Sequence, residues 1–243
     1  MNTADRIRAS VTQVERLRRG SLASPAEGAA VSALKRFQAR RFAGTYADLL
    51  AGGPYVAPTR FFLEELYGDR DFAERDAQFA RIAGAVERLF PRDVGETAAA
   101  LAELHALTES LDHALATAGV DASSTPAAYA EAWRRVGRRA DRERQLERTL
   151  AIGAELSRLV RLPGLRLMLK MMRGPATAAG MQSLQGFLEA GFDTFAAMAK
   201  RPGGAAAFLG TIQAREQRLL ELLFDGDPGA GETELARILG QAR

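Results

Sequence analysis

The chain has 243 residues, of which 47% are hydrophobic and 26% are charged, a composition typical of a soluble globular protein. It contains no cysteine, which excludes disulfide bonds, thiol catalysis, iron–sulfur clusters and zinc–thiolate sites. No run of about 18 apolar residues is present, so no membrane-spanning helix is expected. Because the first ten residues lack an apolar signal core, we expect a cytoplasmic protein.

Arginine dominates the basic residues: only Lys35, Lys170 and Lys200 are lysines among the 33 cationic side chains. A GC-rich bacterial genome would produce this bias, and so would selection for bidentate anion binding. The net charge of +3 is too small for a protein that coats nucleic acid. The arginine run over 134–148 is interleaved with acidic residues, which favours ion pairs along a helix over nucleic-acid binding.

The predicted elements are nearly all helices. In chain order they cover about 3–19, 24–51, 60–67, 71–90, 96–118, 124–160 with or without a break at Gly137, 165–172, 174–201 and 204–224, then a short tail. Thr3 is expected to cap the first helix, and Ser24 with Pro25 and Glu27 forms a capping box for the second. No alternating run indicates a strand. We therefore predict an all-α fold, a single multi-helical bundle of about eight to ten helices over 1–224. Residues 225–243 are predicted to form a flexible connection and a short helical tail.

Three stretches of the chain carry a family resemblance. They are RFFLEELYG and the segment after it over 60–91, MRGPATAAGMQSLQGFLEAGFDTF over 172–195, and QARRFAGTYADLL over 38–50. Together they resemble a family of all-helical bacterial proteins of unknown function that bear an FFLEELYG-type signature. The resemblance implies a helical fold and a bacterial origin, and it implies no catalytic role.

The residues of this signature have a physical interpretation of their own. The apolar side chains Phe61, Phe62, Leu66 and Tyr67 are expected to pack a short helix on two sides. After it, Arg70, Asp71, Arg75 and Asp76 alternate in sign around the next helix start. Asp71 suits the helix cap, and Arg75 and Asp76 would form a partly buried network with Glu64 or Glu65. This group is either a structural helix corner or a ligand site.

A candidate metal site lies on the predicted helix over 96–118. His105, Glu109 and His113 are spaced four residues apart, and Asp112 lies beside them. Such side chains on one helix suit iron or manganese, as in helical oxidases and oxygenases. In the alternative interpretation, His105 hydrogen-bonds Asp112 on the flank of the apolar stripe, while Glu109 and His113 face water.

A candidate anion site lies in a basic gap, defined as the stretch from 156 to 188, which contains no aspartate or glutamate. Its candidate ligand-binding residues are Arg166, Lys170, Arg173 and Thr177, and five of the six methionines lie between 168 and 198. Arginine beside a Gly-Pro helix start suits a phosphate or carboxylate, and methionine and leucine suit an acyl chain. An anionic lipid, an acyl group or an acyl-carrier partner would fit, and so would a contact with a membrane surface. The alternative is a buried connector whose arginine heads reach water.

The leading functional hypothesis is a non-enzymatic helical protein that binds a partner or an anionic amphipathic ligand. The alternative is a metal-dependent oxidase or oxygenase that uses iron or manganese. The chain has no GxSxG elbow, and without strands it has no phosphate-binding strand–loop–helix motif.

Overall fold

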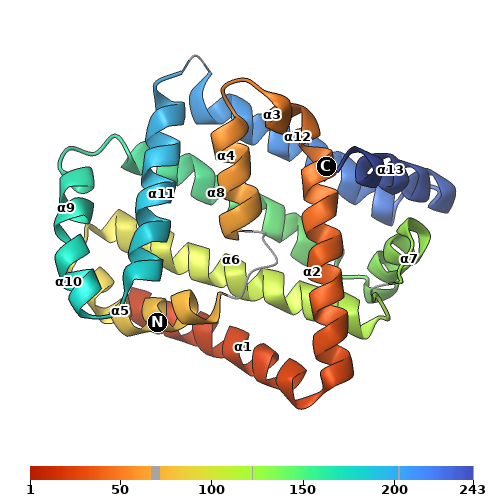
Figure 1. The fold of residues 1–243 in the computed structure, drawn as a ribbon, viewed down its shortest axis with the longest axis horizontal. Helices are drawn as coiled ribbons and strands as arrows, with labels where there is room; N and C mark the ends of the chain where they lie inside the picture. Colours follow the sequence, from red (N-terminus) through yellow and green to blue (C-terminus); the bar gives the residue numbers. More distant parts are fainter. Residues whose placement is uncertain (67–71, 122, 202, 243) are drawn as a thin grey trace.

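The computed structural model describes residues 1–66, 72–121, 123–201 and 203–242, and every regular element within these ranges is helical (Figure 1). The elements are α1 (Thr3–Ala23), α2 (Pro25–Thr45), α3 (Ala47–Ala51), α4 (Val56–Phe61), the π-helical turn η1 (Phe62–Leu66), α5 (Ala73–Leu89), α6 (Arg92–Thr117), α7 (Pro126–Val136), α8 (Arg139–Leu159), α9 (Leu165–Met171), α10 (Arg173–Ala178), α11 (Gln182–Ala199), α12 (Gly204–Phe224) and α13 (Pro228–Gln241). The predicted all-α fold is confirmed. None of the described helices is long and apolar enough to cross a lipid bilayer.

The helices are more numerous than the eight to ten expected, because several predicted helices are divided. The stretch over 124–160 divides into α7 and α8 at Gly137, whose φ is +64°. The stretch that begins at 174 divides into α10 and α11 near Gly180, whose φ is +67°. Glycine adopts this left-handed conformation without a Cβ clash, and it therefore ends a helix at low cost.

The N-terminal caps of α1 and α2 test two predictions made from the local sequence. Ser24 caps α2 as predicted, and its hydroxyl accepts a hydrogen bond from the Glu27 amide. The expected Thr3 cap is wrong: Asn2 accepts from the Asp5 amide at 2.8 Å, and α1 continues through Gly20. Asparagine is an equally good cap, so the helix begins one residue earlier.

The C-terminal segment is helical over more of its length than the sequence predicted. α13 begins at Pro228, inside the stretch expected to be irregular, and the Asp227 carboxylate caps it. Leu235 and Ile238 are buried against α2 and α7. A Cβ at Gly44 would lie 1.9 Å from the Ile238 carbonyl oxygen, so glycine permits α2 and α13 to approach this closely.

The core is organised around α6, which packs against α1, α8 and α2 (Figure 1). Small residues such as Ala83, Ala99 and Ala102 bring α1, α5 and α6 close together. A second cluster, made mainly of large apolar side chains from α2, η1, α11 and α12, contains Phe42, Phe62, Phe195, Phe208 and Ile212. A third joins α2, α6, α7, α12 and α13. On α2, Leu34 belongs to the third cluster and Phe42 to the second, and the buried polar residues Gln38 and Arg41 lie between them.

Candidate functional site

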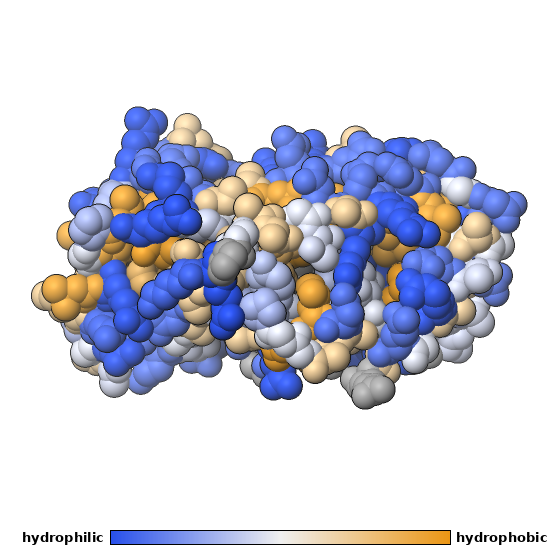
Figure 2. Space-filling view, turned by 90° about the horizontal axis from the view of Figure 1, so that it is seen from above, coloured by the Kyte–Doolittle hydropathy of each residue, from blue (hydrophilic) through white to orange (hydrophobic). Residues whose placement is uncertain are grey.

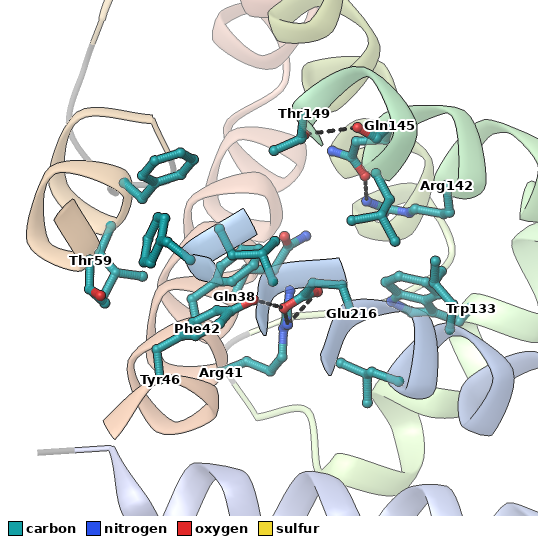
Figure 3. A pocket seen from close by; sticks show the side chains of 17 residues that line it. Gln38, Arg41, Phe42, Tyr46, Thr59, Trp133, Arg142, Gln145, Thr149 and Glu216 are labelled. Carbon is teal, nitrogen blue, oxygen red and sulfur yellow. Dashed lines mark hydrogen bonds and ion pairs between the residues drawn. The ribbon is translucent and has the colours of Figure 1, made fainter. Parts of the chain in front are cut away.

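A cavity of about 70 Å³ lies between α2, α4, α7, α8 and α12, with η1 at one end (Figure 3). Most of its wall is apolar and includes Phe42, Phe62, Leu146, Phe208 and Ile212. Buried polar side chains also reach it, from α2 and α8 above all. An apolar pocket with a few convergent polar groups is the usual form of a small-molecule site.

The first polar group in this cavity is a buried ion pair between α2 and α12. Arg41, which is 4% exposed, donates from Nη1 to both carboxylate oxygens of Glu216 at 2.8 Å. Tyr46 donates its hydroxyl to the same carboxylate at 2.9 Å. The Arg41 guanidinium also lies 3.7 Å from the centroid of the Phe42 ring. The positive charge of Arg41 is therefore neutralised by the carboxylate of Glu216.

Arg142 of α8 is the second cation in the cavity, and it is 6% exposed. It donates to Gln145 Oε1 at 3.1 Å and lies 4.4 Å from the Trp133 ring, but no carboxylate of the described chain forms an ion pair with it. Its neighbours in the arginine run behave differently: Arg138 pairs with Asp141 at 2.5 Å and Arg139 with Glu143 at 2.8 Å. Burial lowers the pKa of Arg142, yet arginine stays protonated in proteins.

Asp112 of α6 is the carboxylate that acts on Arg142 through space. It is buried, and its Oδ1 accepts a hydrogen bond from Gln38 Nε2 at 2.8 Å. Burial raises the pKa of the Asp112 carboxyl, and the positive charge of Arg142 opposes this rise. Asp112 therefore compensates the buried guanidinium only in part, because it makes no direct contact with it.

Two buried donors at the cavity have no hydrogen-bond partner among the described residues. They are the hydroxyl of Thr59 and Nε of Arg41, whereas the indole N–H of Trp133 interacts with the buried hydroxyl of Tyr129. Figure 3 shows Trp133 and Arg142 at one end of the cavity and Thr59 at the other. An unsatisfied buried donor costs about 1–3 kcal/mol, so such groups call for a structural or functional explanation.

The four candidate metal ligands are not brought together by the fold. His105 contacts Asp76 at 3.1 Å, Glu109 contacts Lys35 at 2.6 Å, and Asp112 contacts Gln38. His113 contacts Ser21 and Glu27. In the ranges that the structure describes, no group of three or more such side chains has the arrangement to hold a metal ion.

The alternative interpretation of this helix also needs correction. The expected His105–Asp112 hydrogen bond is absent, because each side chain has a partner on a different helix. Glu109 does not face water, since α2 covers this side of α6 and presents Lys35 to it. His113 also lies under the α1–α2 corner rather than in solvent.

Ser21, His113 and Glu27 resemble a catalytic triad in composition only. The Ser21 hydroxyl lies 2.9 Å and a Glu27 carboxylate oxygen 3.3 Å from the same ring nitrogen, Nε2 of His113. Nδ1 is buried without a partner among the described residues. A triad needs the serine and the carboxylate on opposite ring nitrogens, so this cluster does not have the required geometry.

The signature segment forms a helix corner around Arg75 and Glu65. Arg75 lies between the rings of Phe72 and Phe187, at 4.0 and 4.4 Å, and donates to the Glu65 carbonyl oxygen at 2.8 Å. Its distance to the Glu65 carboxylate is 3.9 Å, whereas Asp76 pairs with Arg18 and His105, so only the Arg75 part of the predicted network is present. Arg70, Asp71 and Tyr67 lie outside the described residues. The α5 N-cap is Phe72, which makes no capping bond through its side chain.

Asp76 is expected to make the stability of the protein sensitive to acid. Burial raises the pKa of its carboxyl, but contacts with His105 and Arg18 outweigh this effect, and the net pKa is lowered. Its stabilising contribution is therefore complete above the unfolded-state value of about 3.9 and is lost as the pH falls through the lower folded-state value. Asp76→Asn should cost about 1.5–3 kcal/mol in urea unfolding at pH 7, and the difference should shrink below about pH 4.

Asp193→Asn is the matched control for this measurement, because Asp193 pairs with Arg166 on the surface. We expect it to change the unfolding free energy by less than about 1 kcal/mol. A difference between Asp76→Asn and the wild type that stays constant from pH 7 to pH 3 would contradict this account.

Two arginines of the basic gap form ion pairs with acidic residues of α11. Arg166 pairs with Asp193 at 2.8 Å, and Arg173 Nε donates to Glu189 at 2.5 Å. Hydrogen bonds from Arg173 and Gln185 lower the pKa of Glu189 to about 2. Lys170 and Thr177 are exposed on α9 and α10. The Glu189 carboxylate therefore occupies the position beside Arg173 at which the sequence predicted a bound anion.

Apolar surface is also found in this part of the molecule. Leu167 and Met171 of α9 are exposed, and Figure 2 shows an apolar patch at the end of the molecule where α9 lies. The expected mostly buried connector is therefore partly exposed.

The residues of this cavity were not identified from the sequence, although one sequence pattern on α2 indicates some of them. Lys35, Gln38 and Arg41 follow each other at helical spacing on one face of α2, and each has a partner on α6 or α12. A polar stripe of this kind inside an apolar bundle indicates a buried network. Arg142 had no comparable signal, because it lies in a run of similar arginines.

The comparisons with known proteins identify the family and no activity. Searches of curated proteins and of solved structures returned no match to this chain. The family model for a domain of unknown function, DUF8198, matches residues 17–230, which include the cavity and all of its lining residues. The chain therefore belongs to the DUF8198 family.

Proposed function

We propose that this protein is a non-enzymatic binding protein that holds an anionic amphipathic ligand in the cavity between α2, α8 and α12. The observation that supports the proposal is Arg142, a buried guanidinium at the cavity with no carboxylate partner in the described chain. A buried charge is costly unless it is paired. An anion bound beside Arg142 would supply the missing partner.

The cavity walls define the rest of the ligand. The surface around Arg142 is dominated by apolar side chains such as Leu146 and Leu220, so the bound molecule needs an apolar part next to its anionic group. An apolar cavity of about 150 Å³ holds a benzene molecule. The space of about 70 Å³ beside Arg142 therefore accepts a carboxylate with a few carbon atoms.

Trp133 provides the test, because it is the only tryptophan of the chain and it lines the cavity. Titration with propionate, followed by tryptophan fluorescence and by calorimetry, is expected to show saturable binding. Propionamide has nearly the same shape and no charge, and it should bind at least about ten-fold more weakly, since one charged hydrogen bond is worth about 1.5–3 kcal/mol.

A pair of arginine variants separates this cavity from the basic gap. Arg142→Gln should weaken propionate binding at least about ten-fold, whereas Arg173→Gln should leave it unchanged because Arg173 pairs with Glu189 on the surface. If only Arg173→Gln loses propionate binding, the binding site lies in the basic gap and not in this cavity. Absence of saturable binding by the wild-type protein would refute the proposal.

The stability of Arg142→Gln is a second measurement on the same variant. A residue retained for binding has little stability to lose, because the unpaired charge is itself costly. We therefore expect an unfolding free energy within about 1 kcal/mol of the wild type. A loss above about 3 kcal/mol would identify Arg142 as a structural element of the core instead.

A further inference from the structure

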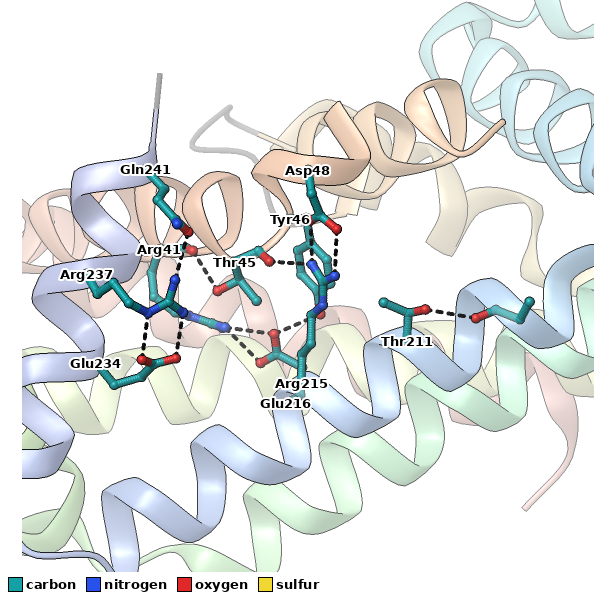
Figure 4. Close-up of polar contacts among 11 residues, drawn as sticks. Arg41, Thr45, Tyr46, Asp48, Thr211, Arg215, Glu216, Glu234, Arg237 and Gln241 are labelled. Carbon is teal, nitrogen blue, oxygen red and sulfur yellow. Dashed lines mark hydrogen bonds and ion pairs between the residues drawn. The ribbon is translucent and has the colours of Figure 1, made fainter. Parts of the chain in front are cut away.

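An open groove of about 1190 Å³ adjoins the cavity on the side of α3 and α13. Figure 4 shows some of the polar side chains that line it, among them Asp48, Arg215 and Arg237. Its walls come from the end of α2, from α3, α12 and α13, and from the α4–η1 corner. The floor is apolar and is formed by Leu50, Leu63, Leu219, Leu222 and Ile238. The arginines Arg60, Arg215, Arg218 and Arg237 line it together with the carboxylates of Asp48, Glu64 and Glu234. The groove therefore combines an apolar track with a rim of mixed charge.

The groove and the cavity share two wall residues, Leu63 and Leu219. Leu63 follows Thr59 by one helical turn, and Thr59 lies at the end of the cavity opposite Arg142 (Figure 3). An elongated molecule whose head is at Arg142 would therefore point its other end toward Leu63 and the groove. Only these leucine side chains are common to both spaces.

We infer that the ligand is a straight-chain anionic amphiphile whose carboxylate binds at Arg142 and whose chain passes between Leu63 and Leu219 into the groove. This inference rests on the function proposed above and adds the ligand class and its path. The cavity alone accommodates a few carbon atoms, whereas the groove is more than ten times larger and has an apolar floor. The hydrocarbon chain thus continues over Leu50, Leu222 and Ile238.

The distribution of paired and unpaired arginines determines which end of the ligand lies inside. In the groove, Arg215 pairs with Asp48 at 2.7 Å and Arg237 pairs with Glu234 at 2.7 Å. Arg60 and Arg218 have no ion pair within the described ranges, but they are exposed and water solvates them. Arg142 is buried, and Asp112 offsets its charge only in part and without a direct contact, so an anion gains most there.

A chain-length series tests the path. Saturated carboxylates from propionate to decanoate, each below its micelle concentration, are titrated against the wild-type protein by Trp133 fluorescence and calorimetry. If the chain continues into the groove, affinity should rise about two- to four-fold for each added methylene as far as octanoate. If affinity stops rising at butyrate or pentanoate, only the cavity binds, and the inference is overturned while the proposed function stands.

A variant that fills the groove gives an independent readout. Ala51 is exposed and lines the groove, so Ala51→Phe should weaken octanoate binding at least about ten-fold and leave propionate binding unchanged. Ala178→Phe, an exposed position on α10, is the matched control and should change neither. Equal octanoate binding by Ala51→Phe and the wild type would contradict the path through the groove.

The orientation has its own test. Arg142→Gln should weaken octanoate binding at least about ten-fold, and Arg218→Gln should weaken it less than about three-fold, because Arg218 is solvated at the rim. The opposite order would place the carboxylate in the groove and overturn the inference. If propionate and octanoate both fail to bind the wild-type protein, the proposed function fails with it.

Discussion

Arg41→Met is expected to lower the free energy of unfolding by about 3–5 kcal/mol, the usual cost of breaking a buried ion pair by removing one partner. Arg41 donates to both oxygens of Glu216 at 2.8 Å, and the methionine would leave that carboxylate without its cation. Tyr46 alone would then donate to Glu216, at 2.9 Å. Urea unfolding followed by circular dichroism at pH 7 measures the loss.

The double variant Arg41→Met/Glu216→Leu separates the cost of an orphaned charge from the value of the pair. Replacing both partners by apolar residues of similar size is often neutral or stabilising, so this variant should recover most of the loss. If Arg41→Met costs less than about 1 kcal/mol, Glu216 has found another cation, and Arg142 is the other cation that lines the cavity.

Phe62→Ala is also expected to cost about 3–5 kcal/mol, because truncating a buried phenylalanine removes apolar contacts and leaves a cavity. The ring is buried, and its centroid lies 5.4 Å from Phe208 of α12, 6.3 Å from Phe195 of α11 and 6.3 Å from Phe61. The side chain therefore joins η1 to two long helices, as the signature predicted. Thermal and urea unfolding of the variant test the value.

Leu167→Ala provides the surface comparison for Phe62. Leu167 is 62% exposed on α9, so its truncation should change stability by about 0.5 kcal/mol or less. Phe62→Leu should be intermediate, since it keeps most of the apolar volume. A cost for Phe62→Ala similar to that for Leu167→Ala would mean that the signature helix packs loosely against α11 and α12.

Local signals in the sequence were sufficient for the helices and their ends. The capping box at Ser24 begins α2, and Gly137, with its positive φ, ends α7. The apolar signature also predicted that Phe61 and Phe62 pack inside the bundle: Phe62 is buried, and the partly buried Phe61 stacks on Phe187 at 5.9 Å. The helix ends depend on neighbours within one or two turns, so short-range chemistry determines them, whereas the signature was predicted from its apolar composition.

Only the tertiary structure shows what covers the face of a helix opposite its apolar stripe. Periodicity placed Glu109 opposite the apolar stripe of α6, which normally means solvent, but α2 crosses there and presents Lys35 at 2.6 Å. The same crossing buries Asp112 beneath Gln38. Helical spacing defines which residues share a face, and it contains no information about which other helix covers that face.

The candidate site shows the same division between sequence and structure. The sequence by itself determined that this chain is an all-helical bundle rich in arginine, with nearly balanced charge. It could not distinguish Arg142, which is buried beside Trp133 without a carboxylate, from Arg138 and Arg139, which pair along α8. The packing of α8 against α6 and α12 makes that difference, because burial removes the water that would otherwise solvate the charge.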